Sequence, residues 1–395
     1  MKVIGCDVGG SFTDIIMVDT DTGEQVVHKI QSTPHSQDIA VIQGIREILE
    51  DNGISPVEVS LVVHGTTVAT NAMLQRKGAR VCLVTTAGLE DLLEIGRQNR
   101  EEIYSLQATR PQPLVGREHR IGVHERLDAQ GNVIEALHDD EVERIVSVLR
   151  KKKPDAVAVS LLFSYCNSEH EMMLLDRIKQ ERKCYAVASS QVLPEFREFE
   201  RTSTTVLEAY LGPLVLGYLK NLDTSLGQLC PKSKLLIMQS NGGTVHSSRA
   251  SGRAIGLAIS GLAGGVMGGW YIACRSGVEQ AITVDMGGTS CDISAIVGKV
   301  VVKPDNEVGG LPLRVPSVDV KTIGAGGGSI AWVDDAGVLH VGPQSAGADP
   351  GPAAYDKRGF EATVTDANLL LGRLNPQFFL GGRVQLNVDC SRTAV

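Results

Sequence analysis

Two short segments with the same arrangement of acidic, glycine and hydroxyl residues stand far apart in the chain. The first is DVGGSFTDI, which begins at Asp7, and the second is DMGGTSCDI, which begins at Asp285. Two adjacent glycines allow a tight turn whose backbone N–H groups can approach a phosphate, because no Cβ atom stands in the way. The hydroxyl residue that follows adds a donor, and the aspartate can hold the water shell of a Mg²⁺ ion. The pattern indicates phosphate-binding chemistry, present twice.

One such segment alone is weak support for a phosphate site, because a Gly-Gly turn with an aspartate is often only a hairpin turn. Two matched segments are harder to explain by turn chemistry, and they favour two pseudo-symmetric domains that hold one polyphosphate between them. Asp7 and Asp285 are the candidate catalytic and Mg²⁺-binding residues. The candidate phosphate-binding residues are Gly9, Gly10, Ser11 and Thr13 in the first segment, and Gly287, Gly288 and Thr289 in the second. Cys291 takes the position of Thr13, so the second segment lacks that hydroxyl.

Three further groups are candidates for the edge of the same cleft, each with a structural alternative. His64, Thr66 and Thr67 stand where a strand ends and a helix begins, but they are equally compatible with a helix cap and a hydrogen-bonded histidine. Ser240 and Asn241 can contact phosphate or substrate, or can form a plain turn. Asp366 is a possible Mg²⁺ or substrate ligand, although aspartate at a helix start is more often a cap. Two arginines, Arg197 and Arg201, flank an acidic stretch; we expect local pairing and leave them outside the site.

The elements that position these residues are strands and helices in alternation. Apolar residues on both sides of each Gly-Gly turn predict two β-hairpins. A helix is expected over residues 36–52, and the runs VSLVVHG, ARVCLVTT and DAVAVSLLFSY read as buried strands. A long apolar helix contains Pro213, which should kink it. A domain boundary is expected near residues 185–200.

Composition excludes several classes of protein. The net charge of −8 is spread along the chain, which argues against nucleic acid and anionic membrane partners. The eight cysteines stand singly without a CxxC pair, so a zinc site or a disulfide scaffold is not expected. The chain enters a strand directly after Met1, without a signal-peptide pattern, and no apolar run is long enough to span a membrane. We expect a cytoplasmic protein without nucleic-acid or membrane partners.

Other nucleotide-binding motifs fail on inspection. The chain contains no G-x-x-x-x-G-K-[ST] segment and no kinase catalytic loop. The run GAGGGS has Ser329 where a dinucleotide-binding fingerprint needs its third glycine.

The paired segments resemble the phosphate-1 and phosphate-2 loops of the actin-like ATPase superfamily. The runs HGTTVATNAMLQRKG, REFERTSTTVLEAYL, QSNGG, GAGGGSI, SAGADPGPAAY and TVTDANLLLGRL together resemble the hydantoinase A/5-oxoprolinase family, which also includes acetone carboxylase subunits. The resemblance extends from residue 3 to the end of the chain.

The resemblance implies an α/β, actin-like (ribonuclease H-like) two-domain ATPase fold, with mixed sheets flanked by helices and a nucleotide cleft between the domains. The domains would be residues 1–190 with the first hairpin and residues 191–395 with the second. A glycine turn would lie beside the adenosine, or else be only a flexible loop; its residues are Gly324, Gly326, Gly327 and Gly328. Family proteins are longer, and the last helix stops after one turn, so we expect a C-terminally truncated chain.

The implied activity is an ATP- and Mg²⁺-dependent hydrolase subunit that phosphorylates a cyclic amide, such as a hydantoin, 5-oxoproline or another lactam, to activate ring opening. The same ATP-binding half would serve the ATPase subunit of a ketone carboxylase of the acetone carboxylase type. A nucleotide-switched module without enzymatic activity is the alternative from a different class. The resemblance also implies a second large subunit or domain of the hydantoinase B type, and oligomerisation.

Overall fold

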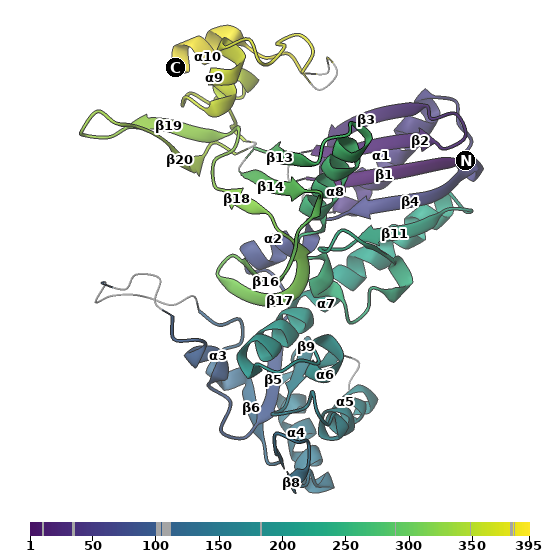
Figure 1. The fold of residues 1–395 in the computed structure, drawn as a ribbon, viewed down its shortest axis with the longest axis vertical. Coiled ribbons are helices and arrows are strands. Elements are labelled where there is room, and N and C mark those ends of the chain that lie inside the picture. Colours follow the sequence, from purple (N-terminus) through teal and green to yellow (C-terminus); the bar gives the residue numbers. More distant parts are fainter. Residues whose placement is uncertain are drawn as a thin grey trace.

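The computed structural model describes residues 1–9, 12–33, 36–99, 104, 112–181, 184–288, 290–347, 349–379, 382 and 384–395. Two large sheets lie on either side of a long helix, and a group of short C-terminal elements lies at the far end of the molecule (Figure 1). Gly10, Ser11 and Thr289, three of the predicted phosphate-binding residues, lie outside the described residues.

The first sheet has six strands and mixed direction. In spatial order they are β12 (Thr244–His246), β11 (Lys234–Met238), β4 (Val59–Gly65), β1 (Lys2–Val8), β2 (Phe12–Asp19) and β3 (Gln25–Gln31). Strands β11, β4 and β1 are parallel, so they end at the same edge of the sheet. Strands β11 and β12 follow the predicted division at residue 190 in sequence, yet they complete this sheet, because β11 pairs with β4.

The two faces of the first sheet have different neighbours. Along β1, Ile4, Cys6 and Val8 are buried in the core against α1 (Gln37–Asp51) and α7 (Glu198–Leu229). Because side chains alternate along a strand, Gly5 and Asp7 lie on the opposite face. That face carries the first candidate site.

The second sheet is fully parallel and buried on both faces. Its strands, in spatial order, are β10 (Tyr185–Ala188), β9 (Ala156–Ser160), β5 (Val81–Thr86) and β6 (Arg120–Val123). Alternate residues of β5 and β9 enter two different clusters, one with α7 and the other with α4 (Asp139–Lys152) and α5 (Glu169–Glu181). Continuous apolar strands are typical of a sheet covered on both sides.

Helix α7 connects the two sheets. It packs against α1 on one side and against β9 and β10 on the other. Its first half is buried on all sides, and most residues there are apolar or small; Arg201 and Glu208 are charged exceptions that are also buried. The helix continues through Pro213 as one element of 32 residues.

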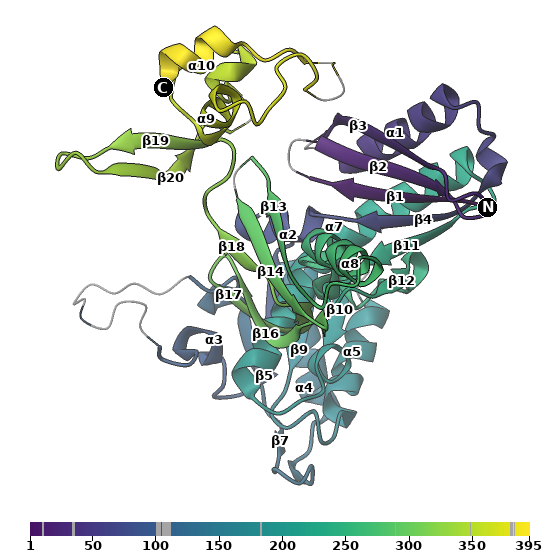
Figure 2. The ribbon, with the colours of Figure 1, turned by 45° about the horizontal axis from the view of Figure 1, so that its top comes forward.

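The second hairpin belongs to a smaller sheet. It contains β13 (Gln280–Met286), β14 (Cys291–Val297), β15 (Lys299–Val300) and β18 (Lys321–Ile323). Helix α8 (Ser260–Arg275) lies between this sheet and the first one, as Figure 2 shows. The two hairpins therefore lie on opposite sides of α8.

The remaining elements are short. They are α2 (Val68–Leu74), α3 (Leu92–Ile95), α6 (Ser189–Val192), α9 (Val364–Leu370) and α10 (Val388–Ala394), with the hairpins β7 (Arg126–Leu127)–β8 (Val133–Glu135), β16 (Val302–Val308)–β17 (Leu311–Val318) and β19 (Ser329–Val333)–β20 (Leu339–Ser345). Within the described ranges, no helix combines the length and the apolar character needed to cross a bilayer.

Candidate functional site

The two predicted hairpins are confirmed, and they share one strand register. In the first, β1 and β2 pair so that Asp7 faces Asp14. In the second, β13 and β14 pair so that Asp285 faces Asp292. Each hairpin thus carries two aspartates opposite each other near its turn.

The turns of the two hairpins also share a hydrogen bond. The N–H of Gly9 donates to the carbonyl of Phe12 at 2.9 Å, and the N–H of Gly287 donates to the carbonyl of Ser290 at 2.9 Å. These residues occupy matching positions in the two segments. The repeat in the sequence is therefore a repeat in backbone structure as well.

The Thr13 hydroxyl lies inside the first hairpin. Thr13 is fully buried, and its Oγ1 lies 3.0 Å from Oγ of Ser32. The Ser32 hydroxyl donates in turn to the carbonyl of Gly9 at 2.8 Å. In this structure Thr13 supports the turn through Ser32, and the matching Cys291 is likewise buried.

The predicted adenosine turn lies against the second hairpin. The N–H groups of Gly327 and Gly328 donate to the carbonyls of Gly287 and Gly288 at 2.8 and 2.7 Å. A Cβ atom on Gly328 would stand 2.9 Å from the Gly288 carbonyl oxygen, whereas one on Gly324 would meet nothing within 4 Å. Gly326 is buried beside them and donates to Oγ of Ser329 at 2.9 Å. The close approach of two backbones explains the glycine at position 328.

A cavity of about 760 Å³ opens on the face of the first sheet that carries Asp7. Its walls come from β1 to β4, β11, the start of α8 and Phe378. A Cβ atom on Gly65 would stand 3.1 Å from Oδ1 of Asp7, and one on Gly261 would stand 3.3 Å from it. Two glycines, at the end of β4 and the start of α8, therefore make room for this carboxylate.

The electrostatic surroundings of Asp7 are unfavourable to its charge. Burial by the surrounding atoms and the negative charges of Asp14 and Asp285 raise the pKa of Asp7 to about 6, while Lys29 acts in the opposite direction. Solvent still reaches Asp7 from the cavity, so the effect of burial is weaker than for a group inside the core. Asp285 of the second hairpin thus contributes to the negative surroundings of Asp7. A carboxylate in this setting is suited to a cation.

Asp7 and Asp285 carry the carboxylate oxygens that a nucleotide-bound Mg²⁺ ion prefers. Such an ion keeps several waters and takes one or two protein carboxylates beside the phosphates. Among the described residues, no group of three or more His, Cys, Asp or Glu side chains is arranged to hold a metal.

His64 lies in the core and not at the cavity. It is fully buried, and its Nε2 lies 2.7 Å from the hydroxyl of Tyr218. Burial lowers the pKa of His64 to about 4, so the ring is neutral near pH 7. The hydrogen-bonded histidine is the alternative that the structure favours.

Thr66 and Thr67 form hydrogen bonds at the start of α2. One of these bonds reaches the first hairpin and the other reaches the start of α8. The Thr67 hydroxyl donates to the carbonyl of Val8 at 3.0 Å, next to the turn. The Ser260 hydroxyl donates to the carbonyl of Thr66 at 3.0 Å, at the first residue of α8. Both threonines thus hold the helix starts beside the cavity.

Ser240, Asn241 and Asp366 are not among the residues that line the cavity. The Ser240 hydroxyl is buried and donates to the carbonyl of Gly256 at 2.8 Å. Asn241 accepts from the N–H of Gly243 at 2.9 Å, which is a plain turn. Asp366 is fully buried and forms a capping box with Thr363 at the start of α9.

Two further groups outside α9 donate hydrogen bonds to Asp366. It accepts from the N–H of Ala354 at 2.8 Å and from the hydroxyl of Ser391 at 2.7 Å. The cap alternative is therefore the one that the structure favours for Asp366.

Several cavity residues were not among the predicted site residues. Lys29 donates to both carboxylate oxygens of Asp14, at 2.7 and 2.9 Å, inside the cavity wall. The start of α8 contributes three glycines, Gly261, Gly264 and Gly265. Their spacing of three and four residues places them on one helix face, a signal that the run SGLAGGVMGG contains.

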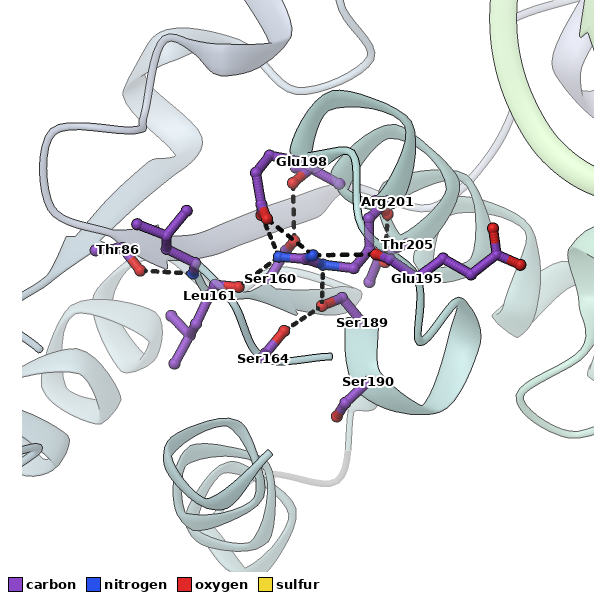
Figure 3. Close-up of polar contacts among 12 residues, drawn as sticks. Thr86, Ser160, Leu161, Ser164, Ser189, Ser190, Glu195, Glu198, Arg201 and Thr205 are labelled. Atoms are coloured by element: carbon purple, nitrogen blue, oxygen red, sulfur yellow. Dashed lines mark hydrogen bonds and ion pairs between the residues drawn. The ribbon is translucent and has the colours of Figure 1, made fainter. Parts of the chain in front are cut away.

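A second polar centre surrounds Arg201 at the start of α7 (Figure 3). The guanidinium is fully buried; it pairs with Glu198 and donates to the carbonyl of Leu161 at 2.7 Å and to the hydroxyl of Ser189 at 3.1 Å. The local pairing expected for Arg201 is confirmed. The network fastens α7 to the ends of β9 and β10, which is a structural role.

Comparison with known proteins identifies relatives along the whole chain. The profile of the Hydantoinase/oxoprolinase N-terminal region matches residues 3–182, and that of Hydantoinase/oxoprolinase matches residues 201–395. The caprolactamase subunit alpha of Pseudomonas jessenii is 38% identical over 400 residues, covering 99% of this chain and 57% of the relative. The 5-oxoprolinase 1 of Arabidopsis thaliana is 35% identical over 405 residues, covering 94% of this chain and 31% of the relative.

Solved structures share the fold. A crystal structure of the ATP-dependent caprolactamase from Pseudomonas jessenii aligns with a TM-score of 0.86 at 36% identity, covering 99% of this chain and 58% of the other. A nucleotide-free acetone carboxylase structure aligns with a TM-score of 0.83 at 31% identity, covering 99% of this chain and 57% of the other. The chain thus spans less than two thirds of the length of these relatives. It is a mixed α/β protein that belongs to the hydantoinase/oxoprolinase family.

Proposed function

We propose that this chain is the ATP-binding part of an enzyme that phosphorylates a cyclic amide and so activates its ring for hydrolysis. The observation that carries the proposal is the repeated hairpin: two turns with one register and one glycine hydrogen bond, beside a cavity lined by Asp7. The family relatives include an ATP-dependent caprolactamase and a 5-oxoprolinase, and the proposal extends their printed activities to this chain.

The nucleotide would lie between the hairpins, in an actin-like arrangement of two domains. The backbone N–H groups of the two turns would hold the β- and γ-phosphates, and the turn at Gly327 and Gly328 would lie beside the adenosine. Asp7 and Asp285 would hold Mg²⁺ through its water shell. The ion supplies positive charge that offsets the charge of the phosphates.

Phosphoryl transfer solves a chemical difficulty of amide hydrolysis. The amide oxygen attacks the γ-phosphorus of ATP, a new oxygen–phosphorus bond forms, and the bond to ADP breaks. A first water adds to the ring carbon and the ring nitrogen leaves as the amine, which produces an acyl phosphate. A second water then adds to that acyl carbon, and the original amide oxygen departs with inorganic phosphate. The transfer step depends mainly on positioning and on charge neutralisation, which is what two rigid glycine turns and two carboxylates provide.

A ketone carboxylase is the second candidate, because the chain superposes on acetone carboxylase with a TM-score of 0.83. The ATP-binding half would then phosphorylate an enolate oxygen or a related intermediate. Relatives of both kinds are subunits of larger assemblies. We therefore propose that a second large subunit or domain of the hydantoinase B type completes the active enzyme.

The test measures ATP cleavage with this chain and its partner subunit together. Cyclic amides (hydantoin, 5-oxoproline and lactams of several ring sizes) should stimulate ATP cleavage, whereas open-chain amides of the same composition should not. Ketones with bicarbonate form a separate arm of the assay. Stimulation by ketones alone would establish the second candidate, and slow ATP cleavage that no substrate stimulates would indicate a nucleotide switch.

Isotope transfer tests the phosphorylation step itself. A cyclic amide labelled with ¹⁸O at its carbonyl should deliver that label to inorganic phosphate, because the amide oxygen leaves bonded to phosphorus. Label that remains wholly in the carboxylate product would contradict the route in which the amide oxygen leaves with phosphate.

A further inference from the structure

A second cavity, of about 570 Å³, lies at the opposite end of the parallel sheet from the Arg201 network. It is formed where β5 and β9 begin, whereas Arg201 holds the strand ends. Five of the described residues that line it are basic: Arg76, Arg80, His119, Lys152 and Lys153. Among the lining residues that the structure describes, none is an aspartate or a glutamate. The wall is positive in a chain whose net charge is −8.

The basic residues come from four separate elements. Arg76 follows α2, Arg80 precedes β5, and His119 ends a short 3-10 helix. Lys152 and Lys153 stand at the end of α4, in the lower part of Figure 1. Cations at the end of a helix stabilise its dipole, which accounts for the two lysines alone. It does not account for the convergence of three further basic groups on the same cavity.

Most of these charges have no acidic partner. Arg80 pairs with Asp155 at 2.9 Å. Arg76 donates to the carbonyl of Gln112 at 3.0 Å, and Lys152 donates to the carbonyl of Glu118. Within the described part of the chain, Arg76, Lys152 and Lys153 form no ion pair. Neighbouring like charges repel one another unless an anion lies between them.

His119 adds an unsatisfied polar atom at the same cavity. Its Nδ1 is shielded from solvent and has no hydrogen-bond partner among the described residues. Its Nε2 lies 3.6 Å from the Glu118 carboxylate. The side chain as a whole is 45% exposed, so His119 contributes an imidazole ring to the open rim of the cavity.

The backbone at two of these positions favours glycine. Arg76 has a φ of 54° and Lys153 has a φ of 49°, in the left-handed region that most side chains avoid. Glycine would be more favourable by about 1 kcal/mol at such a position. Both positions carry long cationic side chains, and both side chains line the cavity.

We propose that this cavity binds a small anion with at least two negative charges, either a phosphate ester or a di- or tricarboxylate. The volume lies within the range of small-molecule sites. The ligand would place one anionic group among Lys152, Lys153 and His119 and another near Arg76. The site is separate from the repeated hairpins and does not depend on the proposed function.

The test is titration calorimetry of the purified chain at low ionic strength, without ATP. Citrate and inorganic pyrophosphate are the probes: citrate reports carboxylate binding, and pyrophosphate reports phosphate binding. The double variant Arg76→Gly with Lys153→Gly removes two charges at positions where glycine suits the backbone. We expect it to melt no lower than the parent and to bind whichever probe the parent binds at least tenfold more weakly.

Lys151→Gln is the matched control, because Lys151 carries the same charge at the same helix end but does not line the cavity. It should bind the probes as the parent does. Equal loss with Lys151→Gln would show diffuse surface attraction and overturn the proposal. Binding of neither probe by the parent would also overturn it. Poly-glutamate is a third probe, and binding of poly-glutamate alone would overturn the proposal and indicate an acidic partner segment instead.

Discussion

Replacing Asp7 with asparagine tests whether the charge of this carboxylate destabilises the folded chain. The pKa of Asp7 is raised from 3.8 to about 6, by burial first and then by Asp14 and Asp285. A raised carboxyl pKa means that the folded chain is favoured when the group is protonated. This stability is fully present below pH 3.8 and is lost as the pH rises through about 6. Asparagine is neutral at every pH, so the variant should keep this stability as the pH rises.

The magnitude follows from the pKa and from solvent access. A change from 3.8 to about 6 corresponds to about 3 kcal/mol at full effect. Solvent reaches Asp7, and screening reduces the net effect to about 1 kcal/mol. Without nucleotide at pH 7.5, Asp7→Asn should therefore raise the melting temperature by about 1–2 °C. The same variant should lose Mg·ATP binding. A gain in stability with a loss of ligand binding is expected when a functional group destabilises the free protein.

Differential scanning calorimetry at pH 7.5 and pH 4.5 measures this difference. The gain from Asp7→Asn should shrink at pH 4.5, where the parent is largely protonated at Asp7. Asp335→Asn is the control, since Asp335 is exposed in the turn of the β19–β20 hairpin. A lower melting temperature at pH 7.5, or the same gain at both pH values, would refute the electrostatic reasoning.

Four further substitutions test other parts of the structure. Asp285→Asn should reduce ATP turnover to background while the circular dichroism spectrum stays unchanged; normal turnover would remove Asp285 from the site. Gly328→Ala should lower the free energy of unfolding by about 1–3 kcal/mol and weaken ATP binding, because its Cβ would overlap a carbonyl oxygen. Gly324→Ala, whose Cβ would meet no protein atom within 4 Å, should leave the free energy of unfolding unchanged. Tyr218→Phe should cost about 1–3 kcal/mol in urea unfolding, since it leaves the buried Nε2 of His64 without its partner; no loss would mean that His64 bonds elsewhere.

Local patterns in the sequence were sufficient for the elements themselves. The two Gly-Gly hairpins, the helix over residues 36–52 and the buried parallel strands are all present. Each depends on neighbours in sequence: turn glycines, alternation of apolar residues, and caps. The same local logic made a cap the simpler reading of Asp366, and the capping box with Thr363 is present.

Assembly of the site depended on contacts between distant segments. No local pattern places Gly261 against the Asp7 carboxylate. Nor does the sequence say that the His64 ring turns into the core to meet Tyr218, a residue 154 positions away.

The sequence alone therefore determined which residues could bind phosphate and which secondary structures carry them, because hydrogen-bond register in a hairpin is set by a few adjacent residues. The tertiary structure decided which of them share a cavity. Strand order and side-chain direction at the ends of β1, β4 and β11 follow from packing against α1, α7 and α8. That packing also converges five basic side chains on a second cavity, a juxtaposition that residue spacing cannot reveal.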